Sequence, residues 1–141
     1  MKLSVNILQV EQVTQSYVDW YSNEEVVGHS DNQYRSFSLD GQCAYVESCL
    51  QSDDVNLYGI FDRTTHIGNV TLNGLSSYHQ RAELSYVIGE TLYWNKGVAT
   101  FAIAEIIKIV KSDFNLAKLY AGTASGNIAS PKVLIKNGFE I

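Results

Sequence analysis

The amino-acid sequence predicts a single domain of the α+β class (mixed α/β), and three observations lead to this class. The chain has 141 residues, a length that suits one domain with one substantial core. Short runs of alternating apolar residues occupy the middle, and segments with apolar residues three or four positions apart lie on either side. The predicted order of elements, β-α-α-β-β-β-α-β-α, mixes strands and helices along the whole chain.

The first third of the chain predicts one strand followed by helices. Residues 3–8 alternate weakly between apolar and polar side chains and indicate the strand. Residues 11–21 carry apolar side chains at helical spacing, and residues 23–38 predict a short helical piece and then a polar loop. Asp40 is the predicted cap of a helix that continues to about Gln51. The face of this helix is expected to consist of Ala44, Tyr45, Cys49 and Leu50.

Three strands are predicted in the middle of the chain. Residues 55–61 and 66–72 form the first two, and residues 62–65 between them suit a hairpin turn. Residues 81–88 form the third strand. One of its faces is expected to carry Leu84, Tyr86 and Ile88, and the other Ala82, Glu83, Ser85 and Val87.

The last third predicts helix, strand and helix after a loop over residues 89–96. A long helix over residues 97–112 follows the loop, and residues 116–122 indicate a further strand. Residues 127–136 predict the last helix, because Asn127 is a favourable N-cap and Asn-Gly follows the segment. The long helix carries apolar residues at three- and four-residue spacing: Ala99, Ile103, Ile106, Ile107 and Val110.

Composition and charge argue against several classes of function. Ten basic and fifteen acidic residues give a net charge of −5, and no basic cluster exists, so nucleic acid is not an expected partner. No apolar stretch approaches the roughly 18 residues of a membrane span. The N-terminus has no secretory hydrophobic region, so a cytoplasmic location is expected. Cys43 and Cys49 are six apart, which suits neither a metal site nor a local disulfide. We expect no metal and two helix-packing thiols.

The connection from the strand at 81–88 to the helix at 97–112 has the character of an anion site. Gly97 and the small Ala99 lie in the loop and the first helical turn, where a ligand can approach the backbone closely. The first amides of a helix have no intrahelical partner, and the helix dipole places positive charge there. A pyrophosphate fits such a site. A purely structural glycine turn explains the same residues, and no GxGxxG or P-loop motif is present.

The same region resembles the GNAT superfamily of acetyl-CoA-dependent N-acetyltransferases. Residues 93–100 are similar to its coenzyme-A pyrophosphate motif, Q/R-x-x-G-x-G/A, and residues 82–88 are similar to its central strand. Residues 127–130 and 133–139 look like its second signature. The set is most similar to the RimJ/RimL-like branch, with Tyr-Trp before the glycine and Lys-Asn-Gly-Phe at the end. Either motif alone is weak, but both in order, about thirty residues apart, make a strong signal.

The resemblance implies a fold and a set of cofactor contacts. The fold is a central, mostly antiparallel sheet flanked by helices. Backbone amides of residues 95–100 would hold the pyrophosphate of acetyl-CoA, and residues 86–88 would pair with the pantetheine arm as an added strand. A strand amide there would polarise the thioester carbonyl. The implied cofactor-binding residues are Tyr86, Val87, Ile88, Trp94, Asn95, Lys96, Gly97, Val98, Ala99, Thr100 and Asn127.

Two positions depart from the superfamily pattern and bear on catalysis. Trp94 replaces the first Gln or Arg of the motif, as is frequent in this branch. Leu134 stands seven positions after Asn127, where many members carry the tyrosine that protonates the leaving thiolate. The branch implies Ser130 as the acid instead, although a small polar residue also suits the first turn of a helix.

The attacking amine must be neutral, so a general base or a water chain is expected near it. Glu83 on the predicted strand is the first candidate, against the alternative of an ordinary solvated strand residue. His66 and His79 are further candidates, although a lone histidine is usually structural or exposed. Positioning of amine and thioester alone supplies part of the catalysis.

The resemblance implies acetyl transfer to a primary amine, either of a small molecule or of a protein N-terminus. Residues 66–70 are similar to relatives that act on the amino group of nucleotide-linked sugars, which favours a small amine. The alternatives are a non-catalytic acyl-CoA-binding module and a purely structural domain. The superfamily continues beyond its Gly-Phe, whereas this chain stops at Ile141. We therefore expect one domain, residues 1–141, that lacks C-terminal strands of the superfamily and leaves an open sheet edge. Three explanations fit this ending: a shortened chain, a homodimer that covers the edge, and a damaged enzyme that still binds the cofactor.

Overall fold

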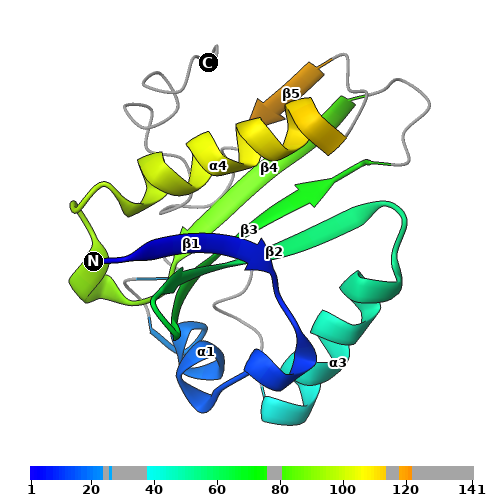
Figure 1. The fold of residues 1–141 in the computed structure, drawn as a ribbon. Helices are drawn as coiled ribbons and strands as arrows, with labels where there is room; N and C mark the ends of the chain where they lie inside the picture. The colour runs from blue at the N-terminus through cyan, green and yellow to red at the C-terminus, as the bar shows by residue number, and fades with distance from the viewer. Residues whose placement is uncertain (24–25, 27–37, 76–80, 114–117, 122–141) are drawn as a thin grey trace.

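The computed structural model describes residues 1–23, 26, 38–75, 81–113 and 118–121, and its central feature is one five-stranded sheet (Figure 1). The strands are β1 (Leu3–Ile7), β2 (Val55–Asp62), β3 (Thr65–Asn73), β4 (Arg81–Ile88) and β5 (Lys118–Ala121). They lie side by side in chain order, and the pairs from β1 to β4 are antiparallel. β5 joins β4 in parallel. The predicted mixed fold with a mostly antiparallel sheet is therefore confirmed.

Helices cover both faces of the sheet. They are η1 (Val10–Gln12), α1 (Gln15–Trp20), α3 (Leu39–Gln51), η3 (Thr91–Tyr93) and α4 (Val98–Asp113). In Figure 1, α4 crosses one face, while α1 and α3 lie together on the other side of β2. The two cores agree with this arrangement, because one is shared by the sheet and α4 and the other by the sheet, α1 and α3.

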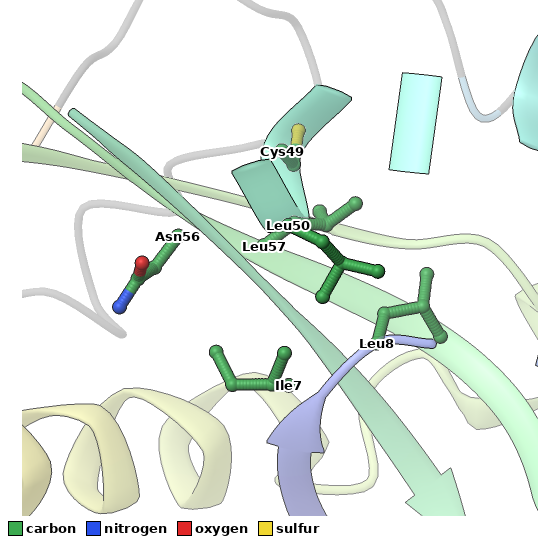
Figure 2. A pocket seen from close by; sticks show the side chains of 6 residues that line it. All are labelled: Ile7, Leu8, Cys49, Leu50, Asn56 and Leu57. Atoms are coloured by element: carbon green, nitrogen blue, oxygen red, sulfur yellow. The ribbon is translucent and has the colours of Figure 1, made fainter. Parts of the chain in front are cut away.

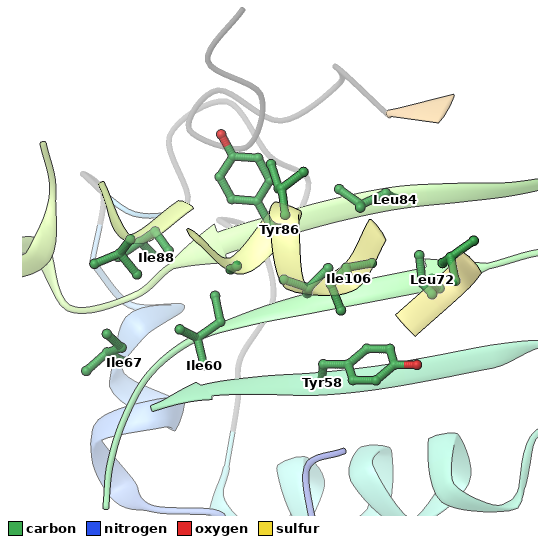
Figure 3. Close-up of a cluster of buried hydrophobic side chains, with 13 residues drawn as sticks. Tyr58, Ile60, Ile67, Leu72, Leu84, Tyr86, Ile88 and Ile106 are labelled. Atoms are coloured by element: carbon green, nitrogen blue, oxygen red, sulfur yellow. The ribbon is translucent and has the colours of Figure 1, made fainter. Parts of the chain in front are cut away.

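The core beneath α4 is aliphatic and holds the central strands in place (Figure 3). Strand side chains alternate between the two faces, so every second residue of β4 points toward α4. Ala82 belongs to this buried set with Leu84 and Tyr86, whereas Glu83 and Ser85 are half-buried. The assignment of Ala82 to the face of Glu83 was therefore wrong, because two residues that share parity share a face. From α4 the core receives Val98, Ala102, Ile103, Ile106 and Val110.

The second core is rich in aromatic side chains, and the helix that contributes Tyr17 and Trp20 to it is shorter than predicted. Residues 11–21 do not form one helix. η1 ends at Gln12, the backbone of Val13 is extended, and α1 begins at Gln15, after its N-cap Thr14. The Thr14 side chain accepts a hydrogen bond from the Tyr17 amide at 3.2 Å, and this N-cap starts a new helix rather than continuing the first. The residues that bury here are Leu8, Tyr17, Trp20, Val26, Val46, Cys49, Leu57 and Phe61.

The helix predicted from Asp40 to Gln51 is confirmed in extent, but its cap and its face differ. Ser38 caps α3, since its Oγ accepts from the Gly41 amide at 3.0 Å, and Asp40 lies in the first turn. The buried face consists of Gln42, Val46 and Cys49, which are four and then three positions apart. Ala44, Tyr45 and Leu50 are exposed, so their predicted burial was wrong. The prediction placed the aromatic Tyr45 inward, whereas the helix buries the polar Gln42.

The predicted hairpin between β2 and β3 is confirmed. Asp62 pairs with Thr65 across the turn, and Arg63 adopts a left-handed conformation, φ 55°. The register between β2 and β3 shifts once: Ile60 pairs with Gly68, but the next residue, Phe61, pairs with His66. The predicted helix at 127–136, with Asn127 and Ser130, lies outside the described residues. The loop at 28–37 and the chain after Ala121 lie outside them too.

Candidate functional site

β5 covers only the first half of one edge of β4. It pairs with β4 from Arg81 to Leu84, opposite Lys118 to Ala121. Beyond Leu84, β4 continues to Ile88 beside β3, and among the described residues no strand extends β5 along it. A strand edge that a neighbouring strand leaves uncovered presents backbone donors and acceptors that an extended ligand can bind as an additional strand. This edge runs directly toward the turn that leads into α4.

The turn itself is open where the sequence predicts an anion. Gly97 has φ 79° and Asn95 has φ 61°, both in the left-handed region. A Cβ built on Gly97 meets no atom within 4 Å. The Phe101 amide donates to the Gly97 carbonyl at 3.0 Å, which makes Gly97 the residue that precedes the helix. The amides of Val98, Ala99 and Thr100 therefore have no hydrogen-bond acceptor within the helix. They lie at the N-terminus of a 16-residue helix, which is the positive end of its dipole.

Trp94 closes the turn onto the end of β4. Its indole Nε1 donates to the Ile88 carbonyl at 2.8 Å, so the turn folds back over the strand it leaves. The ring packs against both the core beneath α4 and the core beneath α1. The structure thus gives Trp94 a scaffolding contact through its ring nitrogen, at the position where the superfamily motif has Gln or Arg.

A second contact fixes the middle of the turn to the end of β2. The Tyr93 hydroxyl donates to Asp62 Oδ2 at 2.7 Å, and the Lys2 amide donates to the other oxygen, Oδ1, at 2.8 Å. The Lys2 amide and then the Tyr93 hydroxyl hold the pKa of the Asp62 carboxyl below its usual range. The same carboxylate raises the pKa of Tyr93. The turn is therefore held in place before any ligand arrives.

Glu90, at the start of the turn, contacts α1. Its Oε2 accepts from the Trp20 indole at 2.6 Å and from the Ser16 hydroxyl at 3.0 Å. Glu90, Asp62 and Trp20 were not predicted as site residues, and Tyr93 was predicted only as part of the motif. These contacts join residues 31 to 74 positions apart, and no local pattern signals them.

Glu83, the predicted base, lies on the sheet face opposite α4. Its register partner on β3 is Asn73, and Ser85 on the same face lies beside Thr71. All four side chains are half-buried, and they form a polar strip across β3 and β4. Glu83 precedes Tyr86 by three residues, which is roughly 10 Å along a strand. Glu83 and Ser85 of this strip therefore lie on the strand whose end β5 does not cover.

His66 occupies the interior rather than a surface where an amine could bind. It is 7% exposed, and its ring lies 4.8–5.2 Å from the rings of Tyr17, Trp20 and Phe61. Its Nε2 lies 2.6 Å from Asn69 Oδ1. Burial lowers the pKa of His66, with the Asn69 contact opposing it. His66 is a structural residue here, and His79 lies outside the described residues.

A separate pocket of about 300 Å³ lies between β1, α3 and β2 (Figure 2). Only Asn56 contributes a polar side chain other than the thiol of Cys49, and the lining shares no residue with the turn before α4. Both cysteines are free thiols, Cys49 buried and Cys43 half-buried. Within the described ranges no group of three or more His, Cys, Asp or Glu is arranged to hold a metal. Among those same residues no helix is long and apolar enough to span a membrane.

Comparison with known proteins gives a family match over nearly the whole chain. Residues 8–140 match the family model described as acetyltransferase (GNAT) domain. An uncharacterized N-acetyltransferase of Schizosaccharomyces pombe is 36% identical over 80 residues, which are 57% of this chain and 42% of that protein. The uncharacterized N-acetyltransferase YoaA of Bacillus subtilis is 33% identical over 59% of this chain and 48% of its own. The chain spans less than half the length of the curated relatives it matches.

Solved structures share the fold. The ribosomal-protein-S5-alanine acetyltransferase of Vibrio fischeri superposes with a TM-score of 0.81 at 17% identity, over 99% of this chain and 80% of that one. The spermidine N-acetyltransferase of Vibrio cholerae, solved in complex with CoA and spermine, gives a TM-score of 0.72 at 19% identity. That match covers 85% of this chain and 70% of the other.

Proposed function

We propose, because this chain belongs to the acetyltransferase (GNAT) domain family, that it transfers an acetyl group from acetyl-CoA to a primary amine. The observation that carries the proposal is the open turn at Gly97, next to the end of β4 that β5 does not reach. A diphosphate needs backbone donors and a positive dipole, and the extended pantetheine arm needs a strand edge. Both features adjoin each other in this fold.

The cofactor contacts follow from that geometry. Backbone amides of residues 95–100 hold the diphosphate, and the exposed Lys96 adds a positive charge beside it. Residues 86–88 pair with the pantetheine arm and bring the thioester alongside β4. Trp94 contributes by holding the turn onto Ile88. Asn127 donates a further hydrogen bond to the cofactor, as the superfamily resemblance implies.

The chemistry is a displacement at the thioester carbonyl. The neutral amine attacks the carbonyl carbon, a C–N bond forms, and negative charge develops on the oxygen, where a β4 amide stabilises it. The C–S bond then breaks, and the thiolate takes a proton from Ser130, whose hydroxyl regains a proton from water in the same step. Glu83 receives the proton that the amine nitrogen loses, through a water molecule, and releases it to solvent before the next cycle. Its half-buried place on β4 supports this role.

The acceptor side is the sheet face that carries Glu83. Its polar strip with Ser85, Thr71 and Asn73 suits an acceptor with a cationic amine and hydroxyl groups. The net charge of −5 also favours a cationic substrate. We infer a small amine, including the amino group of a nucleotide-linked sugar, ahead of a protein N-terminus. We place the chain in the RimJ/RimL-like branch, in the cytoplasm, and as a homodimer.

Two measurements test the proposal. Calorimetric titration with acetyl-CoA is expected to show one site per chain, and a thiol-release screen over a panel of amines is expected to show turnover. Cofactor binding without turnover on any amine would favour a non-catalytic acyl-CoA-binding module. A titration without any heat of binding would refute both readings.

A further inference from the structure

Glu90 is the only described residue through which α1 and the turn before α4 share a side-chain hydrogen bond. Both donors, the Trp20 indole and the Ser16 hydroxyl, meet the same oxygen, Oε2. Trp20 is 3% exposed, so its N–H has no access to solvent and depends on this carboxylate. A bond from a buried donor to a charged acceptor is among the stronger side-chain hydrogen bonds.

The backbone around Glu90 is fixed from the other side as well. The amides of Gly89 and Glu90 both donate to the Ile67 carbonyl on β3, at 2.9 and 3.2 Å. Gly89 lies directly against the Trp20 ring, because a Cβ at this position would overlap the indole carbons. The position of Trp20 therefore sets the position of the chain as it leaves β4.

Glu90 also begins the next segment. The Tyr93 amide donates to the Glu90 carbonyl at 3.0 Å, and the Trp94 amide donates to the Thr91 carbonyl at 3.0 Å. These two hydrogen bonds form η3. After η3 only four residues, 94–97, precede α4. A displacement of Glu90 therefore passes through a short, hydrogen-bonded turn to the amides at the start of the helix.

We propose that Glu90 is a positioning residue for cofactor binding, which the Trp20 and Ser16 donors of α1 hold so that the turn at 91–97 keeps its shape. The inference rests on the proposed function, because it assigns the diphosphate to that turn. Glu90 touches no reacting atom. Its loss weakens the ground-state hold on acetyl-CoA and leaves the chemical step intact once the cofactor is bound.

The test compares Glu90→Ala, Trp20→Phe and Glu90→Gln with a matched control on α1. Trp20→Phe keeps an aromatic ring against Gly89 and removes the N–H, while Glu90→Gln keeps a carbonyl oxygen that accepts. The control is Asp19→Ala, which removes an exposed hydrogen bond within α1, from Gln15 at 2.9 Å.

Steady-state kinetics give the first readout. Glu90→Ala and Trp20→Phe are each expected to raise KM for acetyl-CoA roughly tenfold, with kcat at saturation within about twofold. The double variant is expected to have a KM close to that of the single variants, because both changes remove the same bond between Trp20 and Glu90. Glu90→Gln recovers most of the wild-type KM, and Asp19→Ala leaves it unchanged. A fall in kcat at constant KM, or additive effects in the double variant, would overturn the inference.

Hydrogen exchange of the unliganded protein gives a readout that does not need the cofactor. Amides of residues 91–97 are expected to exchange faster in Glu90→Ala and Trp20→Phe than in Asp19→Ala. Unchanged exchange would overturn the positioning role even in an active enzyme. Faster exchange in a protein that binds no coenzyme A would support the role of Glu90 and refute the proposed function alone.

Discussion

Replacement of Gly97 by alanine tests the candidate anion site with the smallest possible change. The free protein has room for the added methyl group, because no atom lies within 4 Å of a Cβ at this position. The cost to folding is therefore backbone strain alone, since φ is 79° and a non-glycine residue in this region loses roughly 1–2 kcal/mol. For a domain of this length, that corresponds to a fall in Tm of roughly 3–8 °C.

Cofactor affinity is expected to fall further than strain explains, because the methyl group occupies the space in which the diphosphate lies. Overpacking by one carbon costs roughly 1–3 kcal/mol, which is a loss of roughly 5- to 150-fold in affinity. Gly97→Glu adds negative charge to the same space and is expected to abolish binding.

The assay is calorimetric titration with coenzyme A, together with thermal denaturation. Gly74→Ala is the matched control, because Gly74 has a similar φ of 85° and follows β3 rather than β4. It is expected to lose comparable stability and to bind coenzyme A like the wild type. Equal affinity in Gly97→Ala and Gly74→Ala, or retained binding by Gly97→Glu, would refute the assignment of the diphosphate to this turn.

Three further predictions concern single residues. Burial lowers the pKa of His66, so below about pH 6.5 the unfolded chain binds a proton at this residue that the folded protein does not bind. The free energy of unfolding is therefore expected to decrease as the pH is lowered from about 6.5 toward the folded pKa, by up to about 1.4 kcal/mol per pH unit. Denaturant titrations of His66→Gln are expected to lack this dependence. Trp94→Phe, which removes the indole bond to Ile88, is expected to weaken coenzyme A binding several-fold with the fold retained by circular dichroism; unaltered affinity would contradict the scaffolding role. Ser130→Ala is expected to lower kcat with little change in coenzyme A affinity, and equal turnover would remove Ser130 from the mechanism.

Local patterns predicted the sheet and the site turn because their signals are local. The segments 55–61 and 66–72 flank a hairpin turn signal, and residues 81–88 alternate between apolar and polar side chains. The structure places β2, β3 and β4 at these three segments, with ends extended by no more than one residue. The open turn at Gly97 was predicted from a glycine between a strand and a helix. Its left-handed conformation fits that prediction.

Features that depend on distant contacts could not be predicted in the same way. The burial of Gln42 and the exposure of Tyr45 follow from how α3 meets the sheet, and residue type alone predicted the reverse. The bond from Trp20 to Glu90 joins positions 70 apart. Thr14 is a different case, since a threonine before a helical run is a recognised N-cap signal and the sequence already contained the break in the first helix.

The double packing of Trp94 has a consequence for how the protein fails on heating. The described residues include no other side chain that packs against both hydrophobic layers, one on each side of the sheet. The Trp94 ring cannot leave both layers while either layer is intact, so its release and the global melting of the domain become one event. Heat is therefore expected to remove the ligand-binding surface and the tertiary structure in a single transition, without a folded species that has lost only its site.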